Sequence, residues 1–161
     1  MNGDRLLFND FKPTMIYWAG PLFTQAERIW NRLCAECLRN KGYHVILPQD
    51  EAKKFIQDGQ IDFDGIAKDC RQQAIECNVM VAILDGADSD SGTSLEVGLR
   101  IQSKGIVIGV RTDFRCSEDG QLNAMFRLIN KLIYFPSFDE SYEKLCGQID
   151  KIIRDCVVTL H

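Results

Sequence analysis

Hydrophobic positions in this chain follow two alternating patterns. Residues 79–84 form an unbroken apolar run of strand length, which is typical of a strand covered on both faces. Residues 24–41 instead carry apolar side chains at helical intervals, through Ile29, Leu33 and Cys37, and a glycine follows them. The first pattern predicts buried strands, and the second predicts amphipathic helices that cover them.

Applied to the whole chain, these patterns predict strands and helices in alternation. A polar stretch at 51–65 is longer than a typical connection, so we expect a loop there that acts as a lid or a pocket wall. The predicted strands are 15–18, 43–47, 79–84, 106–110 and 132–135, and the predicted helices are 24–41, 66–76, 93–103 and 141–157.

Alternation of this kind predicts an α/β fold with a parallel sheet. We expect a doubly wound, five-stranded sheet in the flavodoxin-like order, with helices on both faces. The 161 residues, of which 45% are hydrophobic, fit one domain spanning 1–161.

Charge and hydropathy narrow the range of partners. The net charge is −4, the sequence pI is near 5.2, and no basic run is present, which argues against nucleic acid as a partner. No segment has the length needed to span a membrane, and the apolar cluster within residues 1–10 is too short for a signal-peptide core. We therefore expect a cytoplasmic protein without a membrane partner.

The seven cysteines are an odd number scattered along the chain, which fits reduced thiols better than a disulfide framework. Cys34 and Cys37 form a C-x-x-C pair, but they fall in the middle of a predicted helix and lack a second cysteine pair or a nearby histidine. We expect no metal site.

The most informative segment is 90–98, which places Asp90 and Glu96 around Gly92 between a buried strand and a helix. Binding sites in α/β sheets lie beyond the carboxyl ends of the strands, and Gly92 would let the backbone come close to a ligand. Two interpretations of Glu96 remain open. With Thr93 it forms a capping-box pattern, or it is a carboxylate nucleophile that the helix dipole helps keep ionised.

Three further polar residues fall near predicted strand ends or on adjoining helices: Tyr17, Gln49 and Asp69. Each of the candidates also has a structural interpretation. Tyr17 could be a core aromatic residue, Asp69 could belong to a solvated helix stripe, and Asp90 could cap a turn. Two carboxylates on opposite sides of a bond suit glycosidic cleavage, and a separation of about 5 Å would point to a retaining reaction.

Four segments also occur in an order that resembles a known family. They are the strand and turn at 16–23, Asp69 before an apolar strand, an Asp-x-Gly-x-x-x-Glu-x-Gly motif at 90–98, and Asn-x-Met at 123–125. Together they resemble the nucleoside 2-deoxyribosyltransferases, over roughly the first three-quarters of the chain. The helix expected at 141–157 gives no match to the C-terminal carboxylate that these transferases often place near their site.

The resemblance implies roles for individual residues. Glu96 would be the nucleophile that attacks the anomeric carbon, Asp69 would exchange protons with the nucleobases, and Tyr17 would orient Glu96. The substrate-binding residues implied in the same way are Asp90, for the sugar hydroxyls, Gln49, for the base, and Gly92, Asn123 and Met125. In the family, Asn123 reaches into the site of a neighbouring subunit, so we expect a homo-oligomer.

The implied activity is transfer of 2-deoxyribose between nucleobases, through a covalent deoxyribosyl-glutamate intermediate and with retention. The partners would be 2′-deoxynucleosides and free bases, with no cofactor. One alternative is a hydrolase of 2′-deoxynucleosides or their 5′-monophosphates. Superfamily members that act on monophosphates tend to carry serine in place of Asn123, although Ser91, Thr93 and Ser94 could bind a phosphate. The other alternative is a non-catalytic nucleotide-binding module, because fold alone does not fix function.

Overall fold

The fold is built around a parallel sheet of five strands in the order β2-β1-β5-β6-β7. The computed structural model describes residues 13–115, 122–135 and 141–158, so the N-terminal segment considered for a signal peptide and Cys116 lie outside the described residues. Counted along the chain, the strands of this sheet lie in the order 2-1-3-4-5, so the predicted flavodoxin-like order is confirmed. The strands are β1 (Met15–Ala19), β2 (His44–Ile46), β5 (Val79–Ile83), β6 (Ile106–Arg111) and β7 (Lys131–Tyr134).

Helices cover both faces of this sheet, as predicted. On one face, α1 (Gln25–Asn40) and α5 (Tyr142–Val158) pack over a buried cluster that includes Trp18 and Ile108. On the other, α3 (Phe63–Glu76) and α4 (Ser91–Gln102) pack over a second cluster that includes Tyr17 and Met80. None of the helices among the described residues is long and apolar enough to cross a membrane.

Successive residues of a strand point to opposite faces, and β1 uses this alternation to connect the two layers. Trp18 points toward α1, where its indole N–H donates to Asn31 Oδ1 at 3.0 Å. Tyr17 points toward α4, and its side chain is fully buried. The Tyr17 hydroxyl is therefore a polar group that the middle of the sheet presents to the layer formed by α3 and α4.

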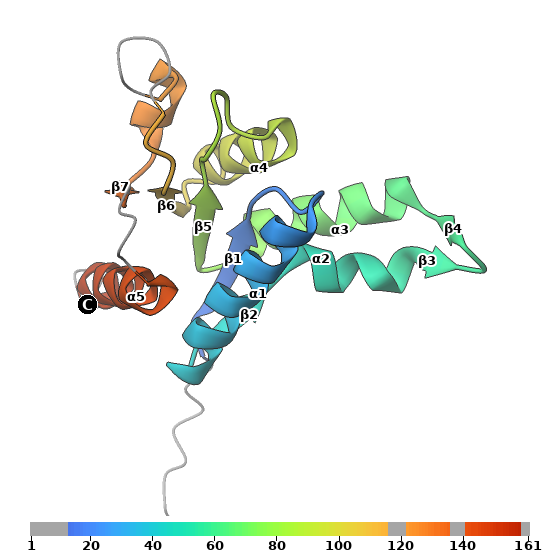
Figure 1. Cartoon of the computed structure of the whole chain (residues 1–161), viewed down its shortest axis with the longest axis horizontal. Helices are drawn as coiled ribbons and strands as arrows, with labels where there is room; N and C mark the ends of the chain where they lie inside the picture. The colour runs from blue at the N-terminus through green and yellow to red at the C-terminus, as the bar shows by residue number, and fades with distance from the viewer. Residues whose placement is uncertain (1–12, 116–121, 136–140, 159–161) are drawn as a thin grey trace, which may run out of the picture.

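The prediction of a loop at 51–65 is wrong, because short helices and strands occupy this stretch. It contains α2 (Pro48–Glu51), the 3-10 helix η1 (Ala52–Phe55) and an antiparallel hairpin of β3 (Ile56–Gln57) and β4 (Gln60–Ile61). Asp58 and Gly59 turn the hairpin with φ angles of 51° and 78°, the left-handed geometry of tight hairpin turns. We call 52–62 the arm. It forms the far tip of the molecule beyond α2 and α3 (Figure 1).

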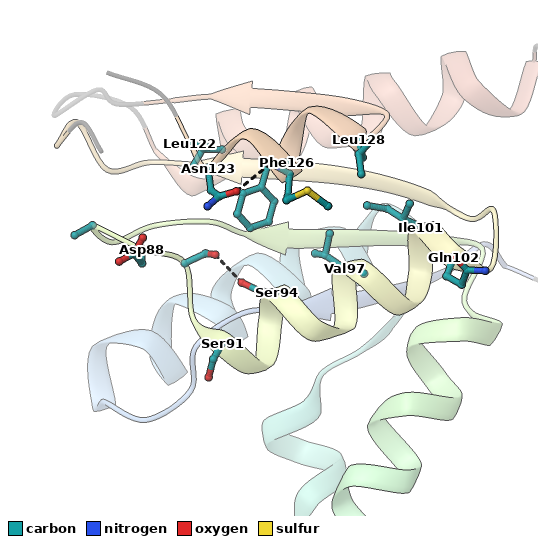
Figure 2. Close-up of a pocket in the computed structure, with 14 residues that line it drawn as sticks. Asp88, Ser91, Ser94, Val97, Ile101, Gln102, Leu122, Asn123, Phe126 and Leu128 are labelled. Atoms are coloured by element: carbon teal, nitrogen blue, oxygen red, sulfur yellow. Dashed lines mark hydrogen bonds between the residues drawn. The ribbon is translucent and has the colours of Figure 1, made fainter. Parts of the chain in front are cut away.

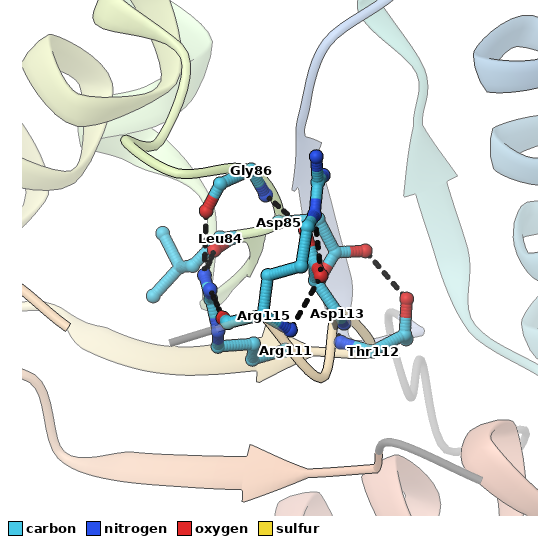
Figure 3. A network of polar contacts seen from close by, with 7 residues as sticks. All are labelled: Leu84, Asp85, Gly86, Arg111, Thr112, Asp113 and Arg115. Atoms are coloured by element: carbon cyan, nitrogen blue, oxygen red, sulfur yellow. Dashed lines mark hydrogen bonds and ion pairs between the residues drawn. The ribbon is translucent and has the colours of Figure 1, made fainter. Parts of the chain in front are cut away.

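Polar contacts hold together the ends of β5 and β6, just before the segment that carries Asp90. The Asp85 carboxylate accepts hydrogen bonds from the backbone N–H groups of Thr112, at 2.6 Å, and Asp113, at 2.9 Å. The buried Arg111 guanidinium donates to the carbonyls of Leu84 and Gly86 (Figure 3). These bonds fix the loop between β5 and α4, and hence the start of α4.

Candidate functional site

Tyr17 and Glu96 meet at the centre of the candidate site. The Tyr17 hydroxyl donates to Glu96 Oε1 at 2.7 Å, across 79 positions of sequence. Tyr17 is fully buried and Glu96 is half-buried. The interpretation of Tyr17 as a core aromatic and its placement beside Glu96 are therefore both correct, since the ring fills the core while the hydroxyl holds one oxygen of the carboxylate.

The capping-box interpretation of Glu96 is wrong, because α4 begins two residues earlier than predicted. Asp90 is the N-cap, and its Oδ2 accepts hydrogen bonds from the N–H of Thr93, at 2.8 Å, and from the Thr93 hydroxyl, at 3.0 Å. Glu96 consequently lies in the second turn. A Cβ on Gly92 would lie 3.2 Å from Asp90 Oδ2, so glycine leaves room for this cap. The interpretation of Asp90 as a cap is confirmed.

Burial dominates the ionisation of Glu96. Loss of solvent raises the pKa of Glu96 to about 7, the hydrogen bond from Tyr17 opposes that rise, and the Asp90 carboxylate adds to it. We expected the helix dipole to keep Glu96 ionised, but its effect falls off within the first turn. A buried carboxyl group that titrates near neutrality is typical of a site residue rather than of a surface cap.

Asp69 lies on α3, directly before Cys70. Burial raises the pKa of the adjacent Cys70 thiol, the Tyr17 hydroxyl lowers it, and the Glu96 and Asp69 carboxylates raise it further. The charges of Glu96 and Asp69, the two candidate catalytic acids, thus both act on the Cys70 thiol. Asp69 is half-buried and its Oδ2 accepts a hydrogen bond from Gln73 Nε2 at 2.6 Å, so the expected solvated stripe on α3 is only partly exposed.

Gln49 lies at the start of α2, where its amide is already engaged. Its Nε2 donates to the Arg28 carbonyl at 2.9 Å, and its Oε1 accepts from Asn31 Nδ2 at 3.3 Å. The side chain is nearly buried. Gln49 therefore ties α2 to α1 in this structure, and a contact with a nucleobase would require exchange of one of these bonds.

Asn123 and Met125 lie between β6 and β7, on a different segment from the other candidate residues. Asn123 is the N-cap of the 3-10 helix η3 (Ala124–Leu128), where its Oδ1 accepts from the Met125 N–H at 3.0 Å. Both residues line a hollow of about 670 Å³ between η3 and α4, in which Val97 of α4 faces Phe126 (Figure 2). Of the described residues, those lining the hollow include Val97 but not Glu96.

The described cysteines, Cys34 and Cys37 among them, are free thiols. Within the described ranges, no group of three or more histidine, cysteine or acidic residues is arranged to hold a metal ion. The polar groups that converge here are carboxylates, a phenol and a thiol, which suit proton transfer and nucleophilic attack at carbon.

Sequence reasoning missed Cys70 and treated Gln73 only as part of a polar stripe. A signal for Cys70 was present, because Ile66, Cys70, Ala74 and Cys77 recur at helical spacing and mark the buried side of α3. Cys70 therefore had to face the sheet directly after Asp69. The contact between Gln73 and Asp69 follows from their four-residue separation on a helix.

Comparison with known proteins relates this arrangement to a family. The family model described as Nucleoside 2-deoxyribosyltransferase matches residues 16–126, the stretch that carries Tyr17, Asp69, Asp90 and Glu96. A search of curated proteins gave no match.

Solved structures share the fold. A conserved protein from Enterococcus faecalis V583 has a TM-score of 0.69 at 24% identity, covering 87% of this chain and 99% of its own. A 2-deoxyribosyltransferase from Bacillus psychrosaccharolyticus has a TM-score of 0.64 at 18% identity, covering 81% and 89%. A CMP N-glycosidase from Clostridium botulinum has a TM-score of 0.60 at 15% identity, covering 86% and 98%.

Proposed function

Because the chain belongs to the nucleoside 2-deoxyribosyltransferase family, we propose that it transfers 2-deoxyribose from one nucleobase to another. Members of this family are enzymes that act on nucleosides, either as transferases or as N-glycosidases. The observation that carries the proposal is the hydrogen bond from the buried Tyr17 hydroxyl to Glu96 Oε1 at 2.7 Å. It holds one carboxylate oxygen and leaves Oε2 available as a nucleophile.

In the first half of the reaction, Glu96 Oε2 attacks C1′ of a 2′-deoxynucleoside as the bond from C1′ to the base nitrogen breaks. The electron pair of that bond goes to the base, and Asp69 supplies a proton to it. The transition state resembles an oxocarbenium ion, and the Glu96 carboxylate stabilises its positive charge before it forms the ester. A sugar without a 2′-hydroxyl reaches this state more easily, since no electron-withdrawing oxygen lies beside C1′.

In the second half, another base attacks C1′ from the face that the first base left. Asp69 accepts a proton from the incoming base, and Glu96 departs as a carboxylate. Two displacements at C1′ give net retention. Asp90 would bind the sugar hydroxyls, with Gly92 giving the ligand access to the backbone, and Gln49 would contact the base. The exchange requires no cofactor.

We propose further that the active protein is a homo-oligomer in which Asn123 and Met125 complete the site of a neighbouring copy. Met125 is 68% exposed and Leu95 of α4 is 67% exposed. Met125 lines the hollow between η3 and α4, and Leu95 directly follows Ser94, which also lines it. A second copy would cover these apolar groups, and an apolar face of this kind is typical of an interface.

The second candidate is hydrolysis, in which water intercepts the sugar ester. It is favoured by the likeness of the fold to a CMP N-glycosidase and by the Ser89 and Ser94 hydroxyls near the start of α4, which lie 2.7 Å apart and could receive a phosphate. Asn123 supports an unphosphorylated substrate instead. The ordering of a base rather than water against C1′ decides between the two outcomes.

The test is product analysis after incubation of the purified protein with 2′-deoxyinosine, with and without free adenine. We expect deoxyadenosine only in the presence of adenine, and release of more than one equivalent of hypoxanthine per site only then, because the ester needs an acceptor before the enzyme can turn over. Hypoxanthine formed at equal rate in both reactions would establish a hydrolase.

A matched control uses Glu96→Gln, which keeps the size and hydrogen-bonding capacity of the side chain but removes the nucleophile. We expect no exchange by this variant. If the wild-type protein bound deoxynucleosides and their monophosphates and converted none of them, the non-catalytic binding module would replace the enzyme proposal.

A further inference from the structure

Two glutamines on α3 each donate a hydrogen bond to an acid one helical turn away, but their environments differ. Gln73 Nε2 donates to Asp69 Oδ2 at 2.6 Å, and both side chains are half-buried. Gln72 Nε2 donates to Glu76 Oε1 at 3.2 Å, and both side chains are exposed. Exposed pairs at this spacing contribute little to the stability of a helix. The shorter bond is also the one made to a candidate catalytic acid.

The hydrogen bond from Gln73 is the one that fixes the Asp69 carboxylate among the described residues. Lys54, at the base of the arm, is exposed and is already paired with Glu51. Gln73 lies on the same helix as Asp69, so the bond that it makes to Oδ2 restricts rotation of the carboxylate.

We propose that Gln73 is the positioning residue for Asp69, holding Oδ2 so that Oδ1 meets the nucleobase. The inference rests on the proposed role of Asp69 as the group that exchanges protons with the base. Gln73 does not touch the substrate, and it acts only through the carboxylate that it binds. Proton transfer requires a heavy-atom distance of about 2.6–3.2 Å, so a carboxylate that is free to rotate would lose contact with the base.

The experiment is a double-mutant cycle on base exchange between 2′-deoxyinosine and adenine. Gln73→Leu is measured in the wild-type protein and in Asp69→Ala, with kcat and KM determined separately. Because a 1 Å misplacement of a catalytic group can cost on the order of 100-fold, we expect Gln73→Leu to lower kcat about 10-fold in the wild-type background, with KM little changed. In Asp69→Ala we expect no additional loss, since no carboxylate remains to be held.

Gln72→Leu is the matched control, because it deletes the same kind of bond on the exposed side of the same helix. We expect it to leave kcat unchanged in both backgrounds, which would separate the effect of holding Asp69 from the loss of a hydrogen bond on the helix. An equal loss of kcat from Gln73→Leu in both backgrounds, or none in either, would overturn the positioning role. If Asp69→Ala alone kept full activity, the role of Asp69 in the proposed function would be wrong and the inference would fall with it.

Discussion

At the scale of single residues, the ionisation of Glu96 depends mainly on burial and on the Tyr17 hydroxyl. Burial raises its pKa to about 7, and the hydrogen bond from Tyr17 lowers it. Glu96 must be ionised to act as a nucleophile. A plot of kcat/KM against pH should therefore rise in a step centred near pH 7, and we call this step the activity limb. Tyr17→Phe removes the influence that lowers the pKa of Glu96, and it should move this limb to higher pH.

The same substitution should also reduce kcat/KM at pH 7. A hydrogen bond to a charged group contributes roughly 1.5–3 kcal/mol, which corresponds to a loss of about 10- to 150-fold. The measurement is the pH profile of base exchange from pH 5 to 9 for both proteins. A limb that moved to lower pH in Tyr17→Phe, or that lay near the ordinary glutamate value in the wild type, would contradict this account.

Sequence could nominate these residues but could not supply their distances. Tyr17 and Glu96 are separated by 79 positions, and only the register of β1 against β5 and the packing of α4 bring them together. For Glu96, local sequence left a capping box open, because Thr93-x-x-Glu96 fits that motif and the sequence does not show whether Thr93 or Asp90 is the N-cap. The structure uses Asp90, and that choice moves Glu96 from the first turn to the second, where burial outweighs the helix dipole.

At the scale of elements, Asp90 has two separable effects on α4. It caps the helix through the Thr93 N–H, and its charge raises the pKa of Glu96. Asp90→Asn keeps an oxygen that can cap the helix but removes the charge, so it should shift the activity limb of Glu96 to lower pH with little loss of stability. Asp90→Ala also removes the cap and should cost about 1 kcal/mol of unfolding free energy.

The measurements are urea unfolding and the position of the pH limb. Thr24→Ala is the control, because Thr24 caps α1 through the Glu27 N–H. It should lose similar stability without moving the limb. Equal stability losses in Asp90→Asn and Asp90→Ala would show that the cap depends on the charge, and an upward shift of the limb in Asp90→Asn would contradict the electrostatic role.

The elements themselves were predictable wherever they are buried. The apolar run at 79–84 became β5 because both faces of that strand are covered. The arm was missed because its strands are two residues long and exposed, which leaves little periodicity to detect. Its turn was nevertheless visible, since Asp58-Gly59 between Ile56 and Ile61 is a hairpin signal.

At the scale of the whole molecule, the edge of the sheet is incompletely covered. Leu132 and Tyr134 of β7 are 48% and 55% exposed, whereas parallel sheets normally have both faces covered. Leu132 lies on the side of α4, because it approaches the position of a Cβ on Gly109 together with Leu84 of the second buried cluster. Met125, which lines the hollow between η3 and α4, is also exposed, and a second copy is the partner we propose for these apolar side chains.

A shared site makes two inactive variants complement each other. Glu96→Ala and Asn123→Ala should each lose base exchange alone, because one lacks the nucleophile and the other lacks the group given to its neighbour. In a two-fold assembly, random mixing of subunits should restore about a quarter of the wild-type activity, since half of the dimers are mixed and one of their two sites is intact. A mixture of Glu96→Ala with Tyr17→Phe should show no such recovery, because both residues come from the same chain. If sedimentation showed mixed oligomers without recovered activity, Asn123 would act within its own chain or not at all.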